Sequence, residues 1–374
     1  MTVFVDQSGQ CGGAELCLAD IAAGLGGQVV LLESGPFASL LQDRGVGVTV
    51  VDAPEVRGIG KAAGPLGWVG VLPAALGLLG RLRREFSGRH ILYFNTAKAL
   101  IVGVAASIGL PCARVFHLHD LLLPEHFSAA NIRLLVLAAN RCDLVIANSR
   151  ATADVFQAAG GTVPVEVVPN GFDPAPFDAV TEAMIRSLRM QWNPEGRRVV
   201  AMFGRITRWK GQDVVLEAMR GLPDAVLWVV GSALFTEDDR IFERELHSAA
   251  GTGRVKFLGF QADVPALMQA ADVIVHASRA AEPFGRVVVE AMLASRPVIA
   301  SGAGGPAEIV VDGETGLLVR AGDPQELRDA LDRVLGDPDR ARVMGRRGRV
   351  RAESLYSLPA VIDKTRRLLA GLSQ

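Results

Sequence analysis

The sequence predicts an α/β protein built from two Rossmann-like, doubly wound domains that face each other across a cleft. Its 374 residues suit two domains of ordinary size. Short apolar runs alternate with stretches of helical periodicity, which is the pattern of βαβ units around a parallel sheet. Each half also opens in the same way, with an apolar run, a glycine-rich loop and a helical stretch.

The composition narrows the class of protein. A formal net charge of −1 excludes a protein that holds nucleic acid through bulk positive charge. The 4 cysteines form no C-x-x-C pair, so neither a disulfide framework nor a zinc site is expected, and a reducing, cytoplasmic setting is favoured. Residues 1–6 lack the basic and long apolar regions of a signal peptide and are typical of a first strand.

The expected strands are short apolar runs bounded by turn-forming residues. In the first half they are Val3–Asp6, Val29–Leu32, Val48–Val51, Ile91–Phe94, Val115–His119, Leu144–Ala147 and Val165–Val168. In the second half they are Val199–Phe203, Val226–Val230, Val255–Phe257, Val273–His276 and Val298–Ala300. The Pro, Asn and Gly residues within 168–173 place the join between the two domains there.

A long helix is expected near the C-terminus of the second half. Asp323 is a capping residue, Pro324 suits the first helical position, and Glu326 completes the capping pattern. Gly336 ends this helix, and the triplet 337–339 is interpreted as a turn rather than a metal-binding Asp-x-Asp motif.

The apolar stretch 62–80 leaves three interpretations open. The first is a loop followed by a buried helix over 73–86. The second is a peripheral contact of 62–86 with the inner face of a membrane, because Arg81, Arg83 and Arg84 follow the apolar residues. The third is a membrane span, which needs about 20 apolar residues.

The loop 204–211 combines glycines with cations between a strand and a helix. Main-chain N–H groups and the helix dipole favour an anion at such a place. Arg205 and Lys210 add two positive charges, so a diphosphate is the expected ligand. The alternative is a solvated basic turn.

The segment 281–290 carries two carboxylates, Glu282 in a loop and Glu290, which is expected about two turns into the following helix. The N–H groups around 285–287 open that helix and can contact a second phosphate. Glu290 can accept hydrogen bonds from vicinal hydroxyls such as those of ribose. The alternative for Glu290 is a surface helix residue, although its apolar neighbours predict that it needs a polar partner if buried.

Two features of the first half suggest weaker hypotheses. The glycine-rich loop 8–15, with Glu33 further on, resembles a dinucleotide-binding loop, but Gly-x-Gly-x-x-Gly is not present. His117 and His119 share one face at a strand end, with His126 beyond. One working histidine there is favoured over a metal site, and His117 is interpreted as structural.

Seven short motifs, taken together, resemble the retaining nucleotide-sugar glycosyltransferases of family four, which have the GT-B fold. They are Gly-Gly-Ala-Glu at 12–15, Leu-His-Asp at 118–120, Val-Pro-Asn-Gly-Phe-Asp at 168–173, Gly-Arg-(x4)-Lys-Gly at 204–211, Glu-Pro-Phe-Gly-(x4)-Glu at 282–290, Gly-Gly-Pro-Ala-Glu-Ile-Val at 304–310 and Asp-Gly-Glu-Thr-Gly-Leu-Leu-Val at 312–319. The resemblance implies an acceptor-side domain over 1–172 and a donor-binding domain over 173–355, with a last helix within 356–374 that packs back on the first domain.

The resemblance also implies site residues. The catalytic set would be His119, Arg205, Lys210 and Glu282, in which the two cations stabilise the leaving diphosphate, Glu282 holds the transferred sugar and His119 reaches the sugar or acceptor. Glu290 would bind the ribose hydroxyls, and 255–260 would contact the base. The donor-binding set would be Gly12, Gly13, Gly204, Phe257, Leu258, Phe284, Gly285, Arg286, Val287 and Glu290.

The sequence therefore predicts a glycosyltransferase that moves a hexosyl-type sugar from a nucleoside-diphosphate sugar to a hydroxyl group. No metal or other cofactor is expected. The acceptor would be an envelope glycolipid or polysaccharide, or a small natural product. An NAD-dependent oxidoreductase and an inactive nucleotide- or sugar-binding relic remain as alternatives.

Overall fold

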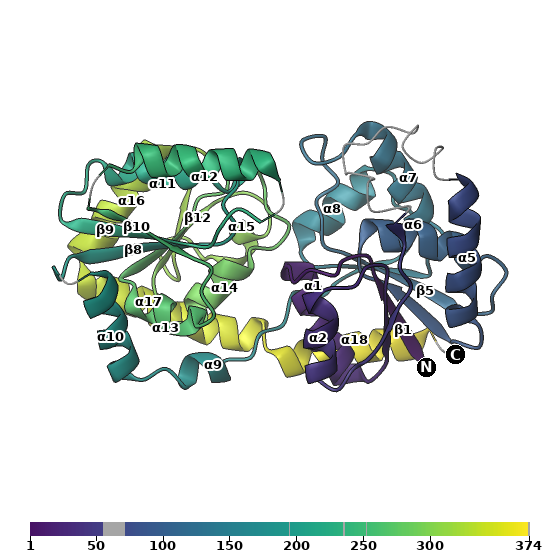
Figure 1. The fold of residues 1–374 in the computed structure, drawn as a ribbon. Helices are drawn as coiled ribbons and strands as arrows, with labels where there is room; N and C mark the ends of the chain where they lie inside the picture. The colour runs from purple at the N-terminus through teal and green to yellow at the C-terminus, as the bar shows by residue number, and fades with distance from the viewer. Residues whose placement is uncertain (55–71, 194, 235, 252, 373–374) are drawn as a thin grey trace. The chain divides into compact units, whose positions relative to one another are not determined.

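The computed structural model describes residues 1–54, 72–193, 195–234, 236–251 and 253–372. The chain divides into two compact units, each with its own parallel sheet (Figure 1). Unit 1 comprises Met1–Gly171 and Leu358–Gln374, and unit 2 comprises Phe172–Ser357. The first domain was expected to end at residue 172, one residue later, and the C-terminal segment to begin at residue 356, two residues earlier.

Unit 1 contains a seven-stranded parallel sheet of order β3-β2-β1-β4-β5-β6-β7. The strands are β1 Thr2–Asp6, β2 Gln28–Leu31, β3 Gly47–Val50, β4 Ile91–Phe94, β5 Ala113–Leu118, β6 Leu144–Ala147 and β7 Val165–Val167. Every residue of β4 and β6 is buried because helices cover both faces of the sheet.

Two groups of helices form these two layers. One core joins α1, α2 and α18 to the sheet, and the other joins α5, α6 and α7 to its opposite face. The helices of unit 1 are α1 Gly13–Leu25, α2 Pro36–Asp43, α5 Leu72–Phe86, α6 Ala97–Ala106, α7 Ala129–Ala139, α8 Arg150–Ala158 and α18 Leu358–Gly371.

The last helix, α18, packs against α1 (Figure 1, yellow beside purple). The Lys364 ammonium donates to the main-chain oxygen of Val167 at 2.8 Å, and Arg366 donates to that of Gly24 at 3.0 Å. Val361 and Leu369 are buried in the same core. The C-terminal segment is thus an integral part of unit 1.

Part of the apolar stretch 62–80 lies outside the described residues, and its remainder forms the start of α5. This helix buries Leu78, Leu82 and Phe86 and leaves Leu76 exposed. Arg83 donates to the main-chain oxygens of Ala106 and Ile108. None of the helices in the described ranges is long and apolar enough to cross a membrane.

Unit 2 contains a six-stranded parallel sheet of order β10-β9-β8-β11-β12-β13. The strands are β8 Arg198–Phe203, β9 Ala225–Val230, β10 Val255–Gly259, β11 Val273–His276, β12 Val298–Ser301 and β13 Leu317–Val319. The helices are α9 Ala175–Asp178, α10 Glu182–Trp192, α11 Gln212–Met219, α12 Glu237–Ala249, α13 Val264–Ala270, α14 Arg286–Leu293, α15 Pro306–Ile309, α16 Pro324–Gly336 and α17 Pro338–Leu355, with a short 3₁₀ turn at Arg208–Lys210.

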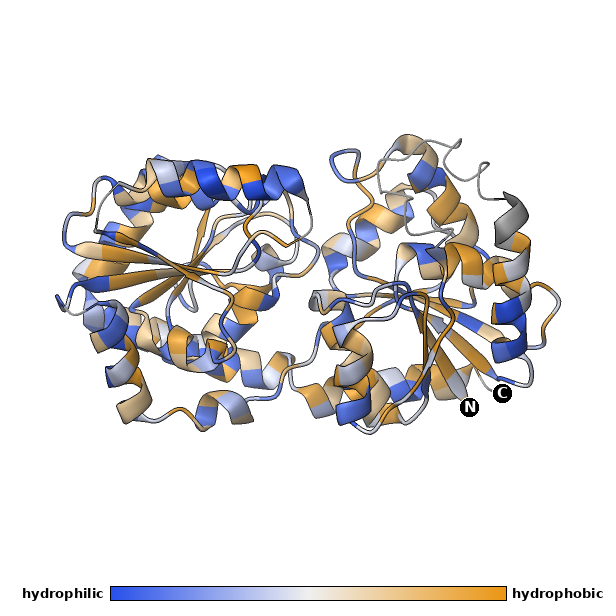
Figure 2. Cartoon of the chain, in the orientation of Figure 1, coloured by the Kyte–Doolittle hydropathy of each residue, from blue (hydrophilic) through white to orange (hydrophobic). Residues whose placement is uncertain are grey.

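The hydropathy pattern explains these layers. Figure 2 shows apolar strands at the centre of each unit and mixed polar and apolar helices around them. Such strands read as continuous apolar runs, which is why most of them could be located from sequence. The strand β13 and the polar helix α12 were not predicted.

The prediction of a turn at 337–339 is wrong. Asp337 follows α16 directly and caps α17, since its carboxylate accepts a hydrogen bond from the Arg340 N–H at 3.0 Å. Pro338 occupies the first helical position, where proline is well tolerated. Gly336 is the last residue of α16, as expected, and Asp337 alone separates the two helices.

Candidate active site

The loop after β8 is held tightly against the end of β11. Gly211 caps α11 with φ 77°, in the left-handed region that favours glycine. A Cβ atom at this position would lie 2.1 Å from the carbonyl oxygen of Ala277, so only glycine fits. The side-chain amide of Gln212 donates to the main-chain oxygen of Arg205 at 2.8 Å. The loop conformation thus places Lys210 beside the residues that follow β11.

Lys210 and Glu282 form an ion pair at this point. The Lys210 Nζ to Glu282 Oε1 distance is 2.6 Å, and both side chains are only 14% exposed. The other carboxylate oxygen, Oε2, accepts a hydrogen bond from the Ser278 hydroxyl at 3.0 Å and contacts His276 Nε2. Burial alone would raise the pKa of Glu282, but Lys210 and then His276 outweigh it and hold that pKa below its usual range. Glu282 is therefore a fixed, ionised acceptor.

The loop after β12 holds the main chain of Glu282. The Gly305 N–H donates to the Glu282 carbonyl oxygen at 2.8 Å, and Gly304 forms a β-bridge with Glu282. A Cβ atom on Gly305 would lie 2.3 Å from the Phe284 carbonyl oxygen. The two glycines thus permit a backbone approach that no side chain would allow.

The second carboxylate lies on α14. Gly285 precedes this helix with φ 99°, and the helix begins at Arg286, so Glu290 lies just over one turn in rather than two. The Arg286 Nε to Glu290 Oε1 distance is 3.6 Å, and the guanidinium lies 4.5 Å from the Phe172 ring centroid. Burial raises the pKa of Glu290, while Arg286 and, less strongly, Lys210 oppose that rise.

The remaining predicted donor residues of unit 2 occupy different environments. Phe284 is buried and stacks on Phe172. The Leu258 side chain is part of the core, whereas Phe257 is half-buried and stacks on His247 at a centroid distance of 3.8 Å. Val287 is half-buried on α14. Gly204 directly follows β8 with φ 131°.

In unit 1 the predicted residues lie at the start of α1 and directly after β5. Gly12 and Gly13 form the start of α1. The Nε2 atom of His119 lies 2.9 Å from Asn95 Oδ1, and the Asn95 amide donates to Asp6 Oδ2 at 2.6 Å. Burial, and secondarily Glu15, raises the pKa of Asp6 to about 8. The Asp6 carboxyl orients the Asn95 amide, which in turn orients the His119 ring.

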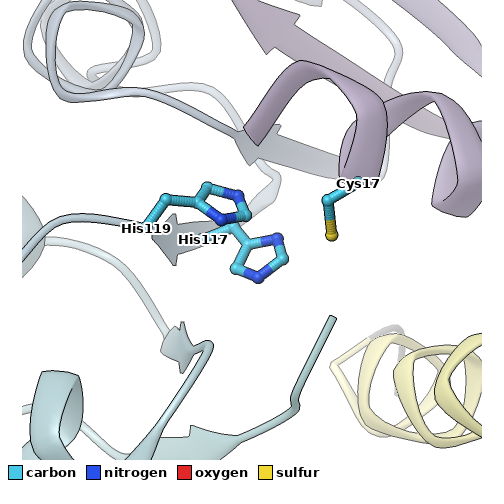
Figure 3. Close-up of side chains that lie close together, drawn as sticks. All are labelled: Cys17, His117 and His119. Atoms are coloured by element: carbon cyan, nitrogen blue, oxygen red, sulfur yellow. The ribbon is translucent and has the colours of Figure 1, made fainter. Parts of the chain in front are cut away.

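His117 is buried beside His119, with 3.8 Å between the ring centroids. Its Nδ1 lies 2.6 Å from the Tyr93 hydroxyl oxygen. Burial, and then His119, lowers the pKa of His117 well below its usual value, so the ring is neutral. Figure 3 shows both histidines together with Cys17 from α1.

Two family models match the chain. The model of glycosyltransferase family 4 matches residues 12–176, and the model of glycosyl transferases group 1 matches residues 185–351. The structure of HepE from Anabaena, in complex with UDP-glucose, superposes with a TM-score of 0.88 at 36% identity, over 99% of each chain. The chain belongs to the family-four glycosyltransferases. Its two parallel-sheet domains have the GT-B fold.

Two curated relatives extend this comparison. The GDP-mannose-dependent α-(1-6)-phosphatidylinositol monomannoside mannosyltransferase of Mycolicibacterium smegmatis is 31% identical over 66% of this chain and 69% of its own length. The lipopolysaccharide core biosynthesis glycosyltransferase LpsE of Rhizobium meliloti is 28% identical over 61% of this chain and 64% of its own length. The first relative is named for GDP-mannose and a phosphatidylinositol monomannoside and the second for lipopolysaccharide core biosynthesis, so family membership alone does not assign a substrate.

The candidate site contains two residues that the sequence interpretation missed. His276 ends β11 and Ser278 follows it, and both hold Glu282. A polar pair at the carboxyl end of a buried strand is a recognisable signal, because ligands of doubly wound sheets bind at that edge. Asn95 and Asp6 carry the same signal in unit 1.

Proposed function

We propose that this protein is a retaining, metal-independent glycosyltransferase that moves a hexosyl-type sugar from a nucleoside-diphosphate sugar to a hydroxyl acceptor. The observation that carries the proposal is the group formed by Lys210, Glu282, His276 and Ser278 in unit 2. It sets a cation for a phosphate beside an ionised carboxylate for sugar hydroxyls.

The carboxylate of Glu282 is held by more than one donor. When a diphosphate attracts the Lys210 ammonium, Ser278 and His276 still bind the other carboxylate oxygen. Glu282 therefore stays oriented while its first oxygen becomes available to accept hydrogen bonds from the sugar hydroxyls. The site couples phosphate binding to sugar binding through one shared ion pair.

The same cation accounts for catalysis. Cleavage of the bond between the sugar and the phosphate leaves negative charge on the diphosphate. Lys210, Arg205 and the N-terminal end of α14 stabilise that charge as it develops, which is electrostatic catalysis. The departing phosphate then accepts the proton of the acceptor hydroxyl, and the new bond forms on the face from which the phosphate left.

The donor class is proposed from one relative. HepE of Anabaena was crystallised with UDP, with UDP and glucose, and with UDP-glucose, and it is 36–37% identical over 99% of this chain. We therefore expect a UDP-sugar, with UDP-glucose as the first to test. The vicinal ribose hydroxyls would be bound by Glu290, whose carboxylate lies beside Arg286.

The test is a transfer assay with UDP-glucose and a panel of lipid, oligosaccharide and small hydroxyl acceptors in the presence of EDTA. We expect a product whose anomeric proton coupling in NMR spectra matches that of the donor. A product of inverted configuration would refute the retaining mechanism, and activity only after divalent metal is restored would refute metal independence.

A thermal-shift panel separates the alternatives. A rise in melting temperature with UDP supports the proposal, whereas a rise with NAD alone would indicate the oxidoreductase. A rise with UDP but no hydrolysis or transfer of UDP-glucose with any acceptor would indicate the inactive relic.

A further inference from the structure

We propose that Cys17, His117 and His119 form a binding site for a thiophilic divalent cation of the Zn²⁺ class. The Cys17 sulfur and one ring nitrogen of each histidine all lie within 4.8 Å of one another. The thiolate and imidazole set is the one that zinc prefers. Figure 3 shows the sulfur on α1 beside the two rings of the β5 end.

Two of the three ligand residues are buried: Cys17 is 2% exposed and His117 is 1% exposed. Within the part of the chain that the structure describes, His117 Nε2 is buried and has no hydrogen-bond partner. An unsatisfied buried nitrogen costs free energy, and an ion bound to it would remove that cost.

The two rings already have the supporting contacts of metal ligands. His117 Nδ1 lies against the Tyr93 hydroxyl, and His119 Nε2 against Asn95 Oδ1, which Asp6 holds in turn. Zinc-binding histidines are typically oriented through the ring nitrogen that does not bind the ion. Both imidazole planes are thus held in place before an ion arrives.

The remaining rearrangement is small. Zinc bonds of about 2.0 Å to nitrogen and about 2.3 Å to sulfur place tetrahedral ligand atoms roughly 3.5 Å apart. Since the three atoms lie within 4.8 Å of one another, they need to approach one another by no more than about 1.3 Å. On binding, the thiol releases its proton to the buffer, and no oxidation takes place.

The consequence for activity rests on the proposed function. A ring of His119 that binds an ion is fixed and unavailable to the sugar or acceptor. Zinc is therefore an inhibitor here and not a catalyst, and binding through Cys17 links the start of α1 to the end of β5.

The binding test uses the full-length protein, stripped with EDTA, and Co²⁺ as a spectroscopic substitute for Zn²⁺. We expect one equivalent of Co²⁺ with a near-ultraviolet thiolate-to-cobalt charge-transfer band. Cys17→Ala should lose this band, and Cys11→Ser, which removes an exposed thiol nearby, should keep it. A wild-type protein that shows no band, or one in which Cys17→Ala keeps it, would overturn the site.

The activity test is separate. Micromolar Zn²⁺ should lower the transfer rate of the wild type at least tenfold, with recovery in EDTA, and Cys17→Ala should keep its activity in Zn²⁺. A Co²⁺ band without inhibition would confirm the site and overturn its consequence for activity. A band in a protein that transfers no sugar would leave the site standing and refute the proposed function.

Discussion

Lys210→Ala tests the central ion pair. The substitution removes the cation that lies 2.6 Å from Glu282 and leaves the carboxylate with its contacts to Ser278 and His276. We expect transfer to be nearly abolished while the protein still folds. Two magnitudes follow from the structure, one for the rate and one for stability.

The rate should fall steeply because the lost charge acts on the leaving group. Removing one preorganised donor to a developing negative charge typically costs about 10²–10³-fold in kcat. A full positive charge that is 14% exposed acts in a medium poorer in water than the surface, so we expect a loss at the upper end of that range. The KM for the donor should rise as well, because the role proposed for Lys210 includes binding the diphosphate in the ground state.

The cost to stability should be modest. Breaking a fully buried ion pair costs about 3–5 kcal/mol because an unpaired charge is left behind. Here Ser278 and His276 still compensate Glu282, so we expect about 1–2 kcal/mol, or roughly 2–8 °C in the melting temperature of a unit of this size. A carboxylate whose pKa is lowered stabilises the fold above its ordinary pKa and loses this contribution as pH falls. The difference between variant and wild type should therefore be largest near neutral pH and shrink in acid.

The assay measures initial transfer rates near neutral pH and thermal unfolding between about pH 2 and 8, because the contribution of Glu282 is lost only below its ordinary pKa. Arg208→Ala is the matched control, because Arg208 is a cation of the same loop. Its ion-pair partner is Glu245, on the exposed side of α12. The control should retain activity within about twofold, as expected for an exposed ion pair. Wild-type turnover in Lys210→Ala, or an equal loss in Arg208→Ala, would refute the reasoning.

Three further predictions concern other elements. Glu290→Gln should raise the melting temperature at pH 8 and make no difference near pH 4, because burial raises the pKa of Glu290 and the ionised form is the costly one; an unchanged difference across that range would contradict this. Asn95→Ala should lower the free energy of unfolding by about 1–3 kcal/mol, because Asp6 loses its amide partner. It should also lower kcat more than it changes KM, and an unchanged kcat would contradict the role of Asn95 in orienting His119. Truncation after Ser357 should unfold unit 1 and leave unit 2 folded, because α18 belongs to the core of unit 1; an unchanged unit 1 in hydrogen exchange would contradict it.

The predictability of the site from sequence differs between its parts. Gly211 was assigned to a phosphate loop because glycine, a cation and a helix start are adjacent in the chain, and the structure requires glycine there. The pairing of Lys210 with Glu282 joins residues 72 positions apart, so no local pattern reveals it. The diphosphate-binding role of Lys210 was expected from the loop itself and the sugar-binding role of Glu282 from the resemblance, and both stay predictions.

The fold was predicted well where a strand is a continuous apolar run. Prediction was less successful where an element or a site depends on contacts that a local sequence pattern does not contain. The turn expected at 337–339 illustrates this limit: the triplet follows the glycine that ends α16, but the capping carboxylate of Asp337 starts a second helix at once. Capping and turn formation use the same residue types, so the residues at 337–339 alone do not distinguish them. In the structure α17 packs against α14.

The sheet order explains why each unit has a cluster of hydrogen-bonded polar side chains at the same place in its sheet. In unit 1 the strand order reverses between β1 and β4, and in unit 2 it reverses between β8 and β11. At such a switch point adjacent strand ends diverge toward opposite faces and leave room for a ligand. Asp6 and Asn95 occupy this point in unit 1, and Lys210 and His276 lie beside it in unit 2.

The next strand along completes each site. His119 follows β5, which pairs with β4, and the glycines that hold Glu282 follow β12, which pairs with β11. The segments after β5 and β12 therefore lie about one interstrand spacing, about 4.8 Å, from the segments after β4 and β11 that carry their partners Asn95 and Glu282. Strand order brings together polar residues that are far apart in the sequence, and no single stretch of sequence contains it. A polar residue at the end of a central strand is therefore a better candidate for a functional residue than the same residue at the end of an edge strand.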